Sequence, residues 1–164
     1  MPYEDLSFAR LDHHRALRHG FPEVIYCEGK TDSQVLAIVS RMLKAKHTVL
    51  ATRASEALAR KVRRLARRAK YHPLSRCIVI SSGRKAKPAG SVLVLSAGTS
   101  DIPVAEEAAV TAETLGSRVK TLYDVGVAGL HRLLSHRNLL DEARVLVVAA
   151  GMDGALPSVV GGLT

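Results

Sequence analysis

The stretch at residues 91–109, SVLVLSAGTSDIPVAEEAA, joins an apolar run to an alanine-rich run through a short polar loop. The run VLVL has the continuous apolar character of a strand that is buried on both faces. The residues after the loop are typical of a helix, and Pro103 fits a first helical turn because its missing N–H would have no partner there. The stretch therefore predicts a strand at 91–96, a loop, and a helix at 102–115.

The same alternation continues downstream of this stretch. Apolar runs predict strands at 118–123 and 144–150, and helices are expected from about residue 128 to 134 and from about residue 155. Continuous apolar strands separated by helices predict a parallel sheet that is covered on both faces, the start of a doubly wound fold. Because no fourth strand follows, we expect either a partner at the open edge or a truncated chain.

The first half of the chain also alternates strands and helices, and it predicts a small α/β unit. A Gly/Pro/Lys-rich segment at 81–90 suggests a boundary between a basic domain at 1–85 and a second domain at 86–164. The elements expected in the first domain are a helix over 1–20 ended by Gly20, strands at 24–27, 48–52 and 76–81, a helix at 32–44, and a helix from Ser55 with Ala69 on its apolar face.

Charge is distributed unevenly between the two halves. The 164-residue chain has a net charge of +9, to which residues 1–85 contribute +11 and residues 86–164 contribute −2. Seven cations lie between Arg60 and Lys70, enough to bind phosphates non-specifically, although such a run is usually a solvated helix face. The run has no interleaved aromatic residues, which argues against stacking on single-stranded nucleic acid.

The composition narrows the cellular setting. Hydrophobic residues make up 47% of the chain, but no apolar run reaches the roughly 18 residues that a membrane span needs. We therefore expect a cytoplasmic protein without a membrane partner. Cys27 and Cys77 lack metal-ligand spacing, and in that compartment they are expected to remain reduced thiols.

Three loops are expected at the carboxyl edge of the parallel sheet, where ligands of such sheets bind. Each loop combines glycine with an acidic residue, and the second is followed by a His-Arg pair. The candidate binding residues are Gly98, Thr99, Ser100, Asp101, Asp124, Gly126, Arg132, Gly151 and Gly154, and the candidate catalytic residues are Asp153 and His131.

The chemistry of these residues suits an anionic ligand. Glycine lets the backbone approach closely, the Ser100 hydroxyl can donate, and the first N–H groups of the following helix are free to bind an anion. His131 could carry a proton, Arg132 could bind a carboxylate or phosphate, and Asp153 could act as an acid or base. The alternatives are that Ser100 or Asp101 only caps the helix, that His131 and Arg132 lie on a solvated helix face, and that Asp124 and Asp153 are loop carboxylates satisfied by backbone donors.

Four segments in order resemble the LarB family, and the similarity covers nearly the whole chain. They are DHHRALRHGFPEVIYCEGKT at 12–31, SAGTSDIPVAEEA at 96–108, YDVGVAGLHRLL at 123–134 and VAAGMDGALPSVVGGL at 148–163. The second half is similar to PurE, the aminoimidazole ribonucleotide carboxylase. The resemblance implies an incomplete flavodoxin-like, PurE-like parallel three-layer α/β/α domain, a nucleotide-binding loop that includes Ser100 and Asp101, and a homo-oligomer such as an octamer.

The resemblance also implies a reaction. The LarB family carboxylates C5 of the pyridinium ring of nicotinic acid adenine dinucleotide and hydrolyses the phosphoanhydride, which releases AMP in nickel-pincer cofactor biosynthesis. The implied co-substrate is CO2 or bicarbonate, with no tightly bound organic cofactor, and Mg²⁺ is an option for the hydrolysis step. The electron-poor ring must accept a nucleophile before its carbon can attack CO2, and in the family a cysteine supplies it.

The chain departs from the family pattern in three respects, two of which concern cysteine and one an acidic residue. It ends before the segment that carries the family's reactive cysteine, and Cys27 stands where the family commonly has glycine. Asp153 stands where the family commonly has glutamate, which is one methylene longer, so Asp153 has a shorter reach as an acid, a base or a metal ligand. We therefore expect this chain to be inactive in carboxylation by itself.

Two other functions remain open. One is a PurE-like purine carboxylase, although the chain has DVGVAGLHR where PurE proteins carry a Ser-Ala-His-Arg motif. The other is a non-catalytic nucleotide- or nucleic-acid-binding module that uses the basic run. Under the enzyme hypothesis a nucleic-acid partner is not expected, and the basic half instead attracts an anionic substrate or packs against neighbours.

Overall fold

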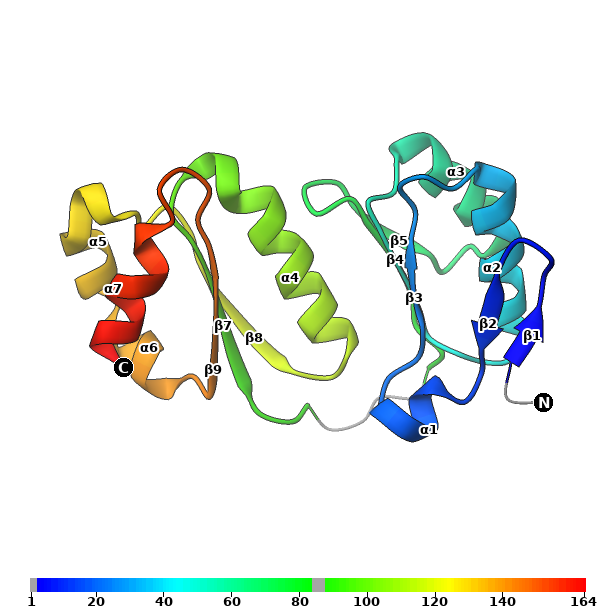
Figure 1. Ribbon diagram of the computed structural model, residues 1–164, viewed down its shortest axis with the longest axis horizontal. Coiled ribbons are helices and arrows are strands. Elements are labelled where there is room, and N and C mark those ends of the chain that lie inside the picture. The colour runs from blue at the N-terminus through cyan, green and yellow to red at the C-terminus, as the bar shows by residue number, and fades with distance from the viewer. Residues whose placement is uncertain (1–2, 84–87) are drawn as a thin grey trace. The chain divides into compact units, whose positions relative to one another are not determined.

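The computed structural model describes residues 3–83 and 88–164, and the chain divides into two compact units, Met1–Lys85 and Ala86–Thr164. Part of the expected boundary segment at 81–90 lies outside the described residues. The protein is a mixed α/β protein, as the sequence predicts (Figure 1). No helix in the described ranges is both long enough and apolar enough to cross a membrane.

The N-terminal unit is built on a four-stranded mixed sheet with the strand order β3-β4-β6-β5. The β3 and β4 strands are parallel, whereas β4 with β6 and β6 with β5 are antiparallel. A separate two-stranded antiparallel sheet, β1-β2, precedes it. The elements are β1 (Tyr3–Asp5), β2 (Arg10–Asp12), α1 (Arg15–His19), β3 (Val24–Tyr26), α2 (Asp32–Lys44), β4 (Val49–Thr52), α3 (Glu56–Leu65), β5 (Lys70–His72) and β6 (Cys77–Ile80).

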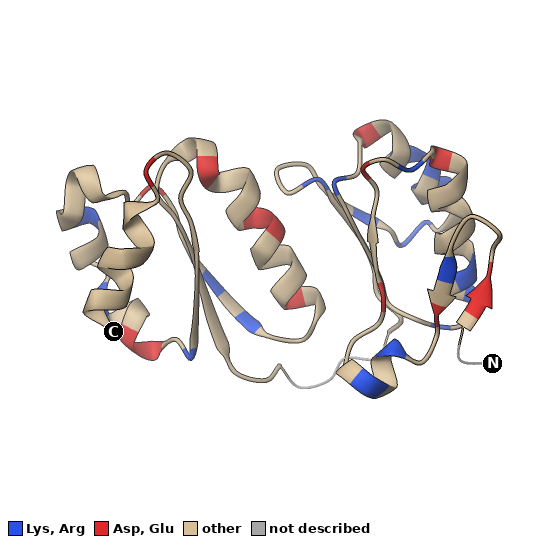
Figure 2. Ribbon diagram, in the orientation of Figure 1, with Lys and Arg blue, Asp and Glu red and all other residues tan. Residues whose placement is uncertain are grey.

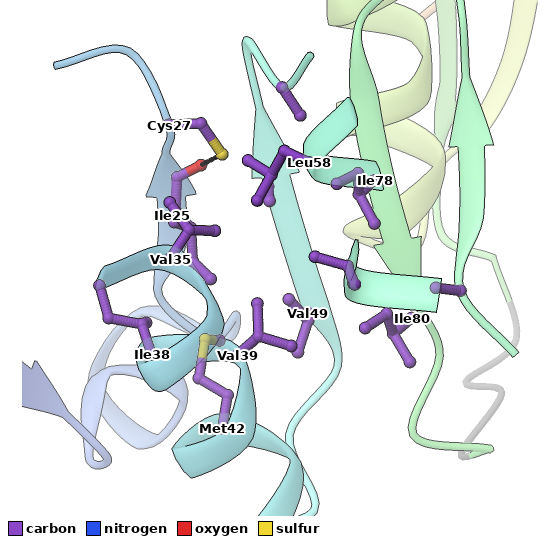
Figure 3. Packing of buried hydrophobic residues seen from close by; sticks show 14 of the residues in the cluster. Ile25, Cys27, Val35, Ile38, Val39, Met42, Val49, Leu58, Ile78 and Ile80 are labelled. Atoms are coloured by element: carbon purple, nitrogen blue, oxygen red, sulfur yellow. Dashed lines mark hydrogen bonds between the residues drawn. The ribbon is translucent and has the colours of Figure 1, made fainter. Parts of the chain in front are cut away.

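The core of this unit forms where the apolar stripe of α2 packs on the sheet. Figure 3 shows Val35, Val39 and Met42 of α2 beside the side chains of the strands. All four residues of β4 are buried, as expected for a central strand. The helix begins at a capping box in which Thr31 and Gln34 satisfy each other's backbone N–H groups.

The predicted helix over residues 1–20 is wrong. The segment instead forms the β1-β2 hairpin, which turns through Ser7 at a φ of 67°, followed by the single-turn α1 that does end at Gly20. The segment has little apolar surface at helical spacing, and pairing with a second strand buries Leu11 in the core. The α3 helix is also shorter than expected: Ala66 leaves helical geometry, so Ala69 is buried outside the helix, just before the unpredicted strand β5.

The C-terminal unit contains a three-stranded sheet with the order β8-β7-β9, in which both pairs are parallel. The strands and helices predicted there are confirmed, and α6 is an additional helix that the sequence pattern did not indicate. The elements are β7 (Ser91–Ser96), the 3-10 helix η1 (Thr99–Asp101), α4 (Ile102–Thr114), β8 (Arg118–Leu122), the 3-10 helix η2 (Val127–Gly129), α5 (Leu130–Leu134), α6 (Arg137–Glu142), β9 (Val145–Ala149) and α7 (Ala155–Leu163).

Helices cover both faces of this sheet. Leu93 and Leu95 of β7 pack in the cluster that includes residues of α5, α6 and α7, whereas Val94 packs with Ala105 and Ala109 of α4. Figure 1 shows α4 on one side of the strands and α5, α6 and α7 on the other. The order β8-β7-β9 matches the first three strands of the flavodoxin-like order 2-1-3-4-5, in which ligands bind at the carboxyl ends between the first and third strands.

Candidate functional site

A cavity of about 310 Å³ lies at the carboxyl edge of the β8-β7-β9 sheet. All three predicted loops contribute to its wall, and in Figure 1 they meet at the upper end of this unit. The polar and glycine residues that line it are Gly98, Ser100, Asp101, Asp124, Gly126, Arg132, Gly151, Asp153 and Gly154, and Met152 and Leu156 are among its apolar residues.

The loop after β7 is held in shape by the carboxylate of Asp101. One oxygen, Oδ2, accepts a hydrogen bond from the Gly98 N–H at 2.9 Å, and the other, Oδ1, accepts one from the Gly151 N–H at 3.0 Å. Asp101 therefore does not cap α4 with its side chain, as the sequence left open, but ties the β7 loop to the β9 loop. Ser100 beside it is exposed, at the start of the α4 helix and in the wall of the cavity.

The loop after β8 turns sharply at Asp124, whose φ of 58° lies in the left-handed region. Its N–H donates to the Ser96 hydroxyl at 3.1 Å, and the Val125 N–H donates to the Ser96 carbonyl at 3.0 Å. Gly126 then passes so close to β7 that a Cβ there would lie 2.8 Å from the Ala97 carbonyl oxygen. The absence of a side chain at Gly126 is what lets the two loops meet.

An ion pair on this loop places a cation at the cavity. The Arg132 guanidinium lies 2.8 Å from Asp124 Oδ2, with 38% of the Arg132 side chain and 51% of the Asp124 side chain exposed. The guanidinium has five N–H donors, so pairing with one carboxylate leaves donors for a bound anion. Asp124 therefore orients Arg132 without blocking it.

The loop after β9 is the most exposed wall. Gly154 has a φ of 64°, and among the described residues the Asp153 carboxylate accepts a single long hydrogen bond, from the Ala155 N–H at 3.4 Å. Met152 is fully exposed beside it. Asp153 is thus free to face a ligand at the mouth of the cavity.

Two predicted residues do not line the cavity in the described part of the chain. Thr99 and His131 are both exposed and lie outside its wall. His131 follows Leu130 at the start of α5, and its ring lies near the Arg132 side chain: a Cβ at Gly129 would meet Arg132 Nε at 2.9 Å and His131 Cε1 at 3.3 Å. The direct involvement of His131 in catalysis stays a prediction without support from its position.

The two cysteines lie far along the sequence from this cavity, in the N-terminal unit. Both are buried, and neither forms a disulfide bond. Burial raises the pKa of the Cys27 thiol to about 11, and the thiol lies 4.0 Å from the Ile25 carbonyl oxygen. A protonated, buried thiol is a poor nucleophile, so Cys27 is a core residue.

The described side chains do not gather into a resident metal site. No group of three or more His, Cys, Asp and Glu side chains that could hold an ion occurs in the ranges 3–83 and 88–164. In the cavity, both Asp101 oxygens accept backbone hydrogen bonds and Asp124 is paired with Arg132. These two carboxylates therefore help to hold the loops in place.

One functional residue was missed by the sequence reasoning. Ser96 is completely buried and supports the β8 loop through both its hydroxyl and its carbonyl oxygen. The signal was available: Ser96 is a polar residue at the last position of an otherwise apolar strand. Its partners, however, come from a loop almost thirty positions away and could not be identified from the pattern.

Comparison with known proteins gives two findings. Residues 3–82 match the family model of the LarB/PurE-like N-terminal domain. An uncharacterized protein of Methanocaldococcus jannaschii is 36% identical over an alignment of 167 positions that covers 96% of this chain and 65% of the relative. The chain thus spans about two thirds of the length of the curated relative that it matches.

Proposed function

This chain belongs to the LarB family, and we propose that its C-terminal unit binds nicotinic acid adenine dinucleotide in the cavity at the β8-β7-β9 edge. The observation that carries the proposal is the convergence of three glycine-containing loops and the oriented Arg132 on one opening. The match of residues 3–82 to the LarB/PurE-like N-terminal domain supports a role of the kind found in that family.

The cavity suits part of such a ligand. Its volume of about 310 Å³ is at the lower end of the range for small-molecule sites, about 300–1,000 Å³. We expect one mononucleotide half to be enclosed and the other to extend past Met152 to solvent. The phosphates would lie at the exposed Ser100 in the wall of the cavity, where its hydroxyl can donate to an anion. Arg132 would bind a phosphate or the pyridine carboxylate.

The family reaction has two parts in this proposal. Carboxylation adds CO2, supplied directly or as bicarbonate, to C5 of the pyridinium ring, and hydrolysis then breaks the phosphoanhydride and releases AMP. Asp153 at the mouth of the cavity is the carboxylate best placed to assist a proton transfer, since Asp101 and Asp124 are already engaged. Mg²⁺, if it takes part, would arrive with the substrate phosphates.

The first part needs a nucleophile that activates the ring. No thiol lines the described cavity, because both cysteines are buried in the N-terminal unit. We therefore propose that this chain alone binds the dinucleotide but forms no biscarboxylated product. A turnover assay with deamido-NAD and bicarbonate tests this, and any such product would contradict it.

Binding is tested by calorimetric titration of the 164-residue chain with nicotinic acid adenine dinucleotide. Arg132→Gln should weaken binding by about tenfold or more, since a charge-assisted contact is lost. The matched control is Arg137→Gln on α6. Arg137 Nε lies 3.1 Å from Asp141 Oδ1, and the substitution removes an ion pair whose exposure is similar to that of Arg132 and Asp124. Equal affinity of both variants, or no saturable binding, would contradict the site. Tighter binding of aminoimidazole ribonucleotide would favour the PurE-like alternative.

We also propose that the protein is a cytoplasmic homo-oligomer. Leu130 and Leu134 lie one turn apart on α5 and are 42% and 49% exposed, and this apolar pair suits a subunit contact. Native mass spectrometry would detect the assembly, and Leu134→Lys should dissociate it. A monomeric parent protein would contradict the proposal.

A further inference from the structure

The N-terminal unit has its own groove, between α3 and the strands β5 and β6. Its volume is about 250 Å³. Ala59, Ala69 and Ile78 line it with small or apolar side chains that are almost fully buried, and the exposed Arg60 and Arg63 and the half-buried Tyr71 also line it. The groove therefore combines an apolar floor with a cationic rim.

The helix geometry explains this combination. Residues 56, 59, 60 and 63 of α3 are spaced i, i+3, i+4 and i+7, so they share one face of the helix. Alanine at position 59 leaves space on that face, and the long arginine side chains on either side of it reach solvent. The groove exists because a small residue lies between two large cationic ones.

The surroundings of the groove are strongly basic. Residues 57–83 contain eight Lys and Arg residues and no Asp or Glu. Figure 2 shows Lys and Arg along α3 and along the chain that follows it. A concave site in a field of one sign concentrates ligands of the opposite charge. The expected ligand is therefore an anion.

The two arginines are not equivalent. Arg60 donates to Glu56 Oε1 at 2.9 Å, so its charge is partly compensated by the carboxylate that also lines the groove. The Arg63 side chain has no hydrogen-bond or ion-pair partner among the described residues. Its guanidinium is available to a phosphate as a bidentate donor, whereas the Glu56 carboxylate in the groove would repel such a ligand.

We propose that this groove binds a nucleoside phosphate, with the phosphate on Arg63 and the apolar part of the ligand in the groove. A small ligand fits better than a nucleic-acid strand. The basic run offers no series of aromatic side chains on which successive bases could stack. The aromatic residue in the groove, Tyr71, is held in place by its hydroxyl, which donates to the Ala54 carbonyl at 3.3 Å. The proposal is independent of the cavity in the C-terminal unit.

The test is a titration of the whole chain with AMP, followed by amide NMR so that the two units are read separately. AMP should shift the Ala59, Ala69 and Ile78 amides saturably. Arg63→Ala should weaken this site by about tenfold. Arg64→Ala is the matched control: it removes the same charge from an exposed position of α3 outside the groove, and it should change the affinity less than about twofold.

Two further titrations test whether the ligand is an anion. Glu56→Gln should tighten AMP binding, because it removes the repelling carboxylate and releases Arg60. Adenosine should bind at least about tenfold more weakly than AMP.

Equal losses in Arg63→Ala and Arg64→Ala would overturn the site in favour of a diffuse electrostatic field. Binding of a single-stranded oligonucleotide without binding of AMP would overturn it in favour of a nucleic-acid surface. Shifts of Gly98 and Gly151 alone would mean that AMP binds only in the C-terminal cavity, which would also overturn the groove site while leaving the proposed function intact.

Discussion

Asp101 and Gly151 are joined across the carboxyl edge of the C-terminal sheet, although fifty positions separate them in the sequence. The Asp101 carboxylate accepts the Gly151 N–H at 3.0 Å and, with its other oxygen, the Gly98 N–H at 2.9 Å. One side chain thus fixes both the β7 loop and the β9 loop. Because ligands of this fold class bind between these strands, Asp101 shapes the opening of the site.

Replacement of Asp101 by alanine should destabilise the protein by about 1–3 kcal/mol, because two backbone N–H groups lose a charged acceptor. Urea unfolding of both proteins measures the loss. Asp153→Ala is the control, since Asp153 is exposed and accepts only one hydrogen bond of 3.4 Å, and it should cost less than about 0.5 kcal/mol. Equal effects of the two substitutions would show that the tie between the loops carries no stability.

Two glycines should respond oppositely to alanine. Gly126→Ala would bring a Cβ to 2.8 Å from the Ala97 carbonyl oxygen, and the forced backbone shift should cost about 1–3 kcal/mol. Gly161→Ala in α7 meets no atom within 4 Å and should stabilise the protein by about 0.5–1 kcal/mol, because alanine favours the helix. Thermal unfolding measures both. A neutral Gly126→Ala variant would contradict the close approach of the two loops.

The elements that sequence reasoning found are those whose signals are local. The parallel strands of the C-terminal unit are continuous apolar runs, and the α2 and α3 helices begin at Thr31 and Ser55, which accept backbone hydrogen bonds as N-caps. The hairpin at residues 3–12 has no comparable signal. Its strands are only three residues long, and it forms because pairing buries Leu11 in a core made by distant residues.

The candidate site was predictable to the same degree. The ends of parallel strands meet at one edge, so the three loops could be grouped from the sequence alone. The links between them could not be, because hydrogen bonds such as that from Asp124 N–H to Ser96 connect residues that are distant in the chain. The helical phase that turns Arg132 toward Asp124 and leaves His131 outside the cavity depends on where α5 begins.

Ser96→Ala should loosen the β8 loop. The substitution removes the hydroxyl that accepts the Asp124 N–H at 3.1 Å, and the expected cost is about 1 kcal/mol. Hydrogen exchange of the Asp124 amide should become faster, whereas exchange in α4 should not change. Ser158→Ala on the exposed side of α7 is the matched control and should leave the Asp124 amide protected. Unchanged exchange at Asp124 in the Ser96 variant would show that the hydroxyl does not support the loop.

The N-terminal unit should lose stability as the pH falls below about 6.5. Burial, together with the charge of the neighbouring His13, lowers the pKa of His47 below its ordinary value of 6.5, and the two rings stack with their centroids 5.6 Å apart. Glu4 and Arg41 complete the group of charges here: Glu4 lies 3.3 Å from the His13 ring nitrogen and 2.9 Å from Arg41.

The direction follows from proton binding. Below the ordinary pKa the unfolded chain binds a proton at His47 that the folded chain resists, so protonation favours unfolding. The contribution of His47 is therefore complete above pH 6.5 and is lost as the pH falls toward the lowered pKa of the folded state. Urea unfolding between about pH 5 and 8 measures the slope. His47→Gln should flatten it, whereas His136→Gln, which retains His47, should not. The same slope in His47→Gln as in the parent protein would exclude His47 as its source.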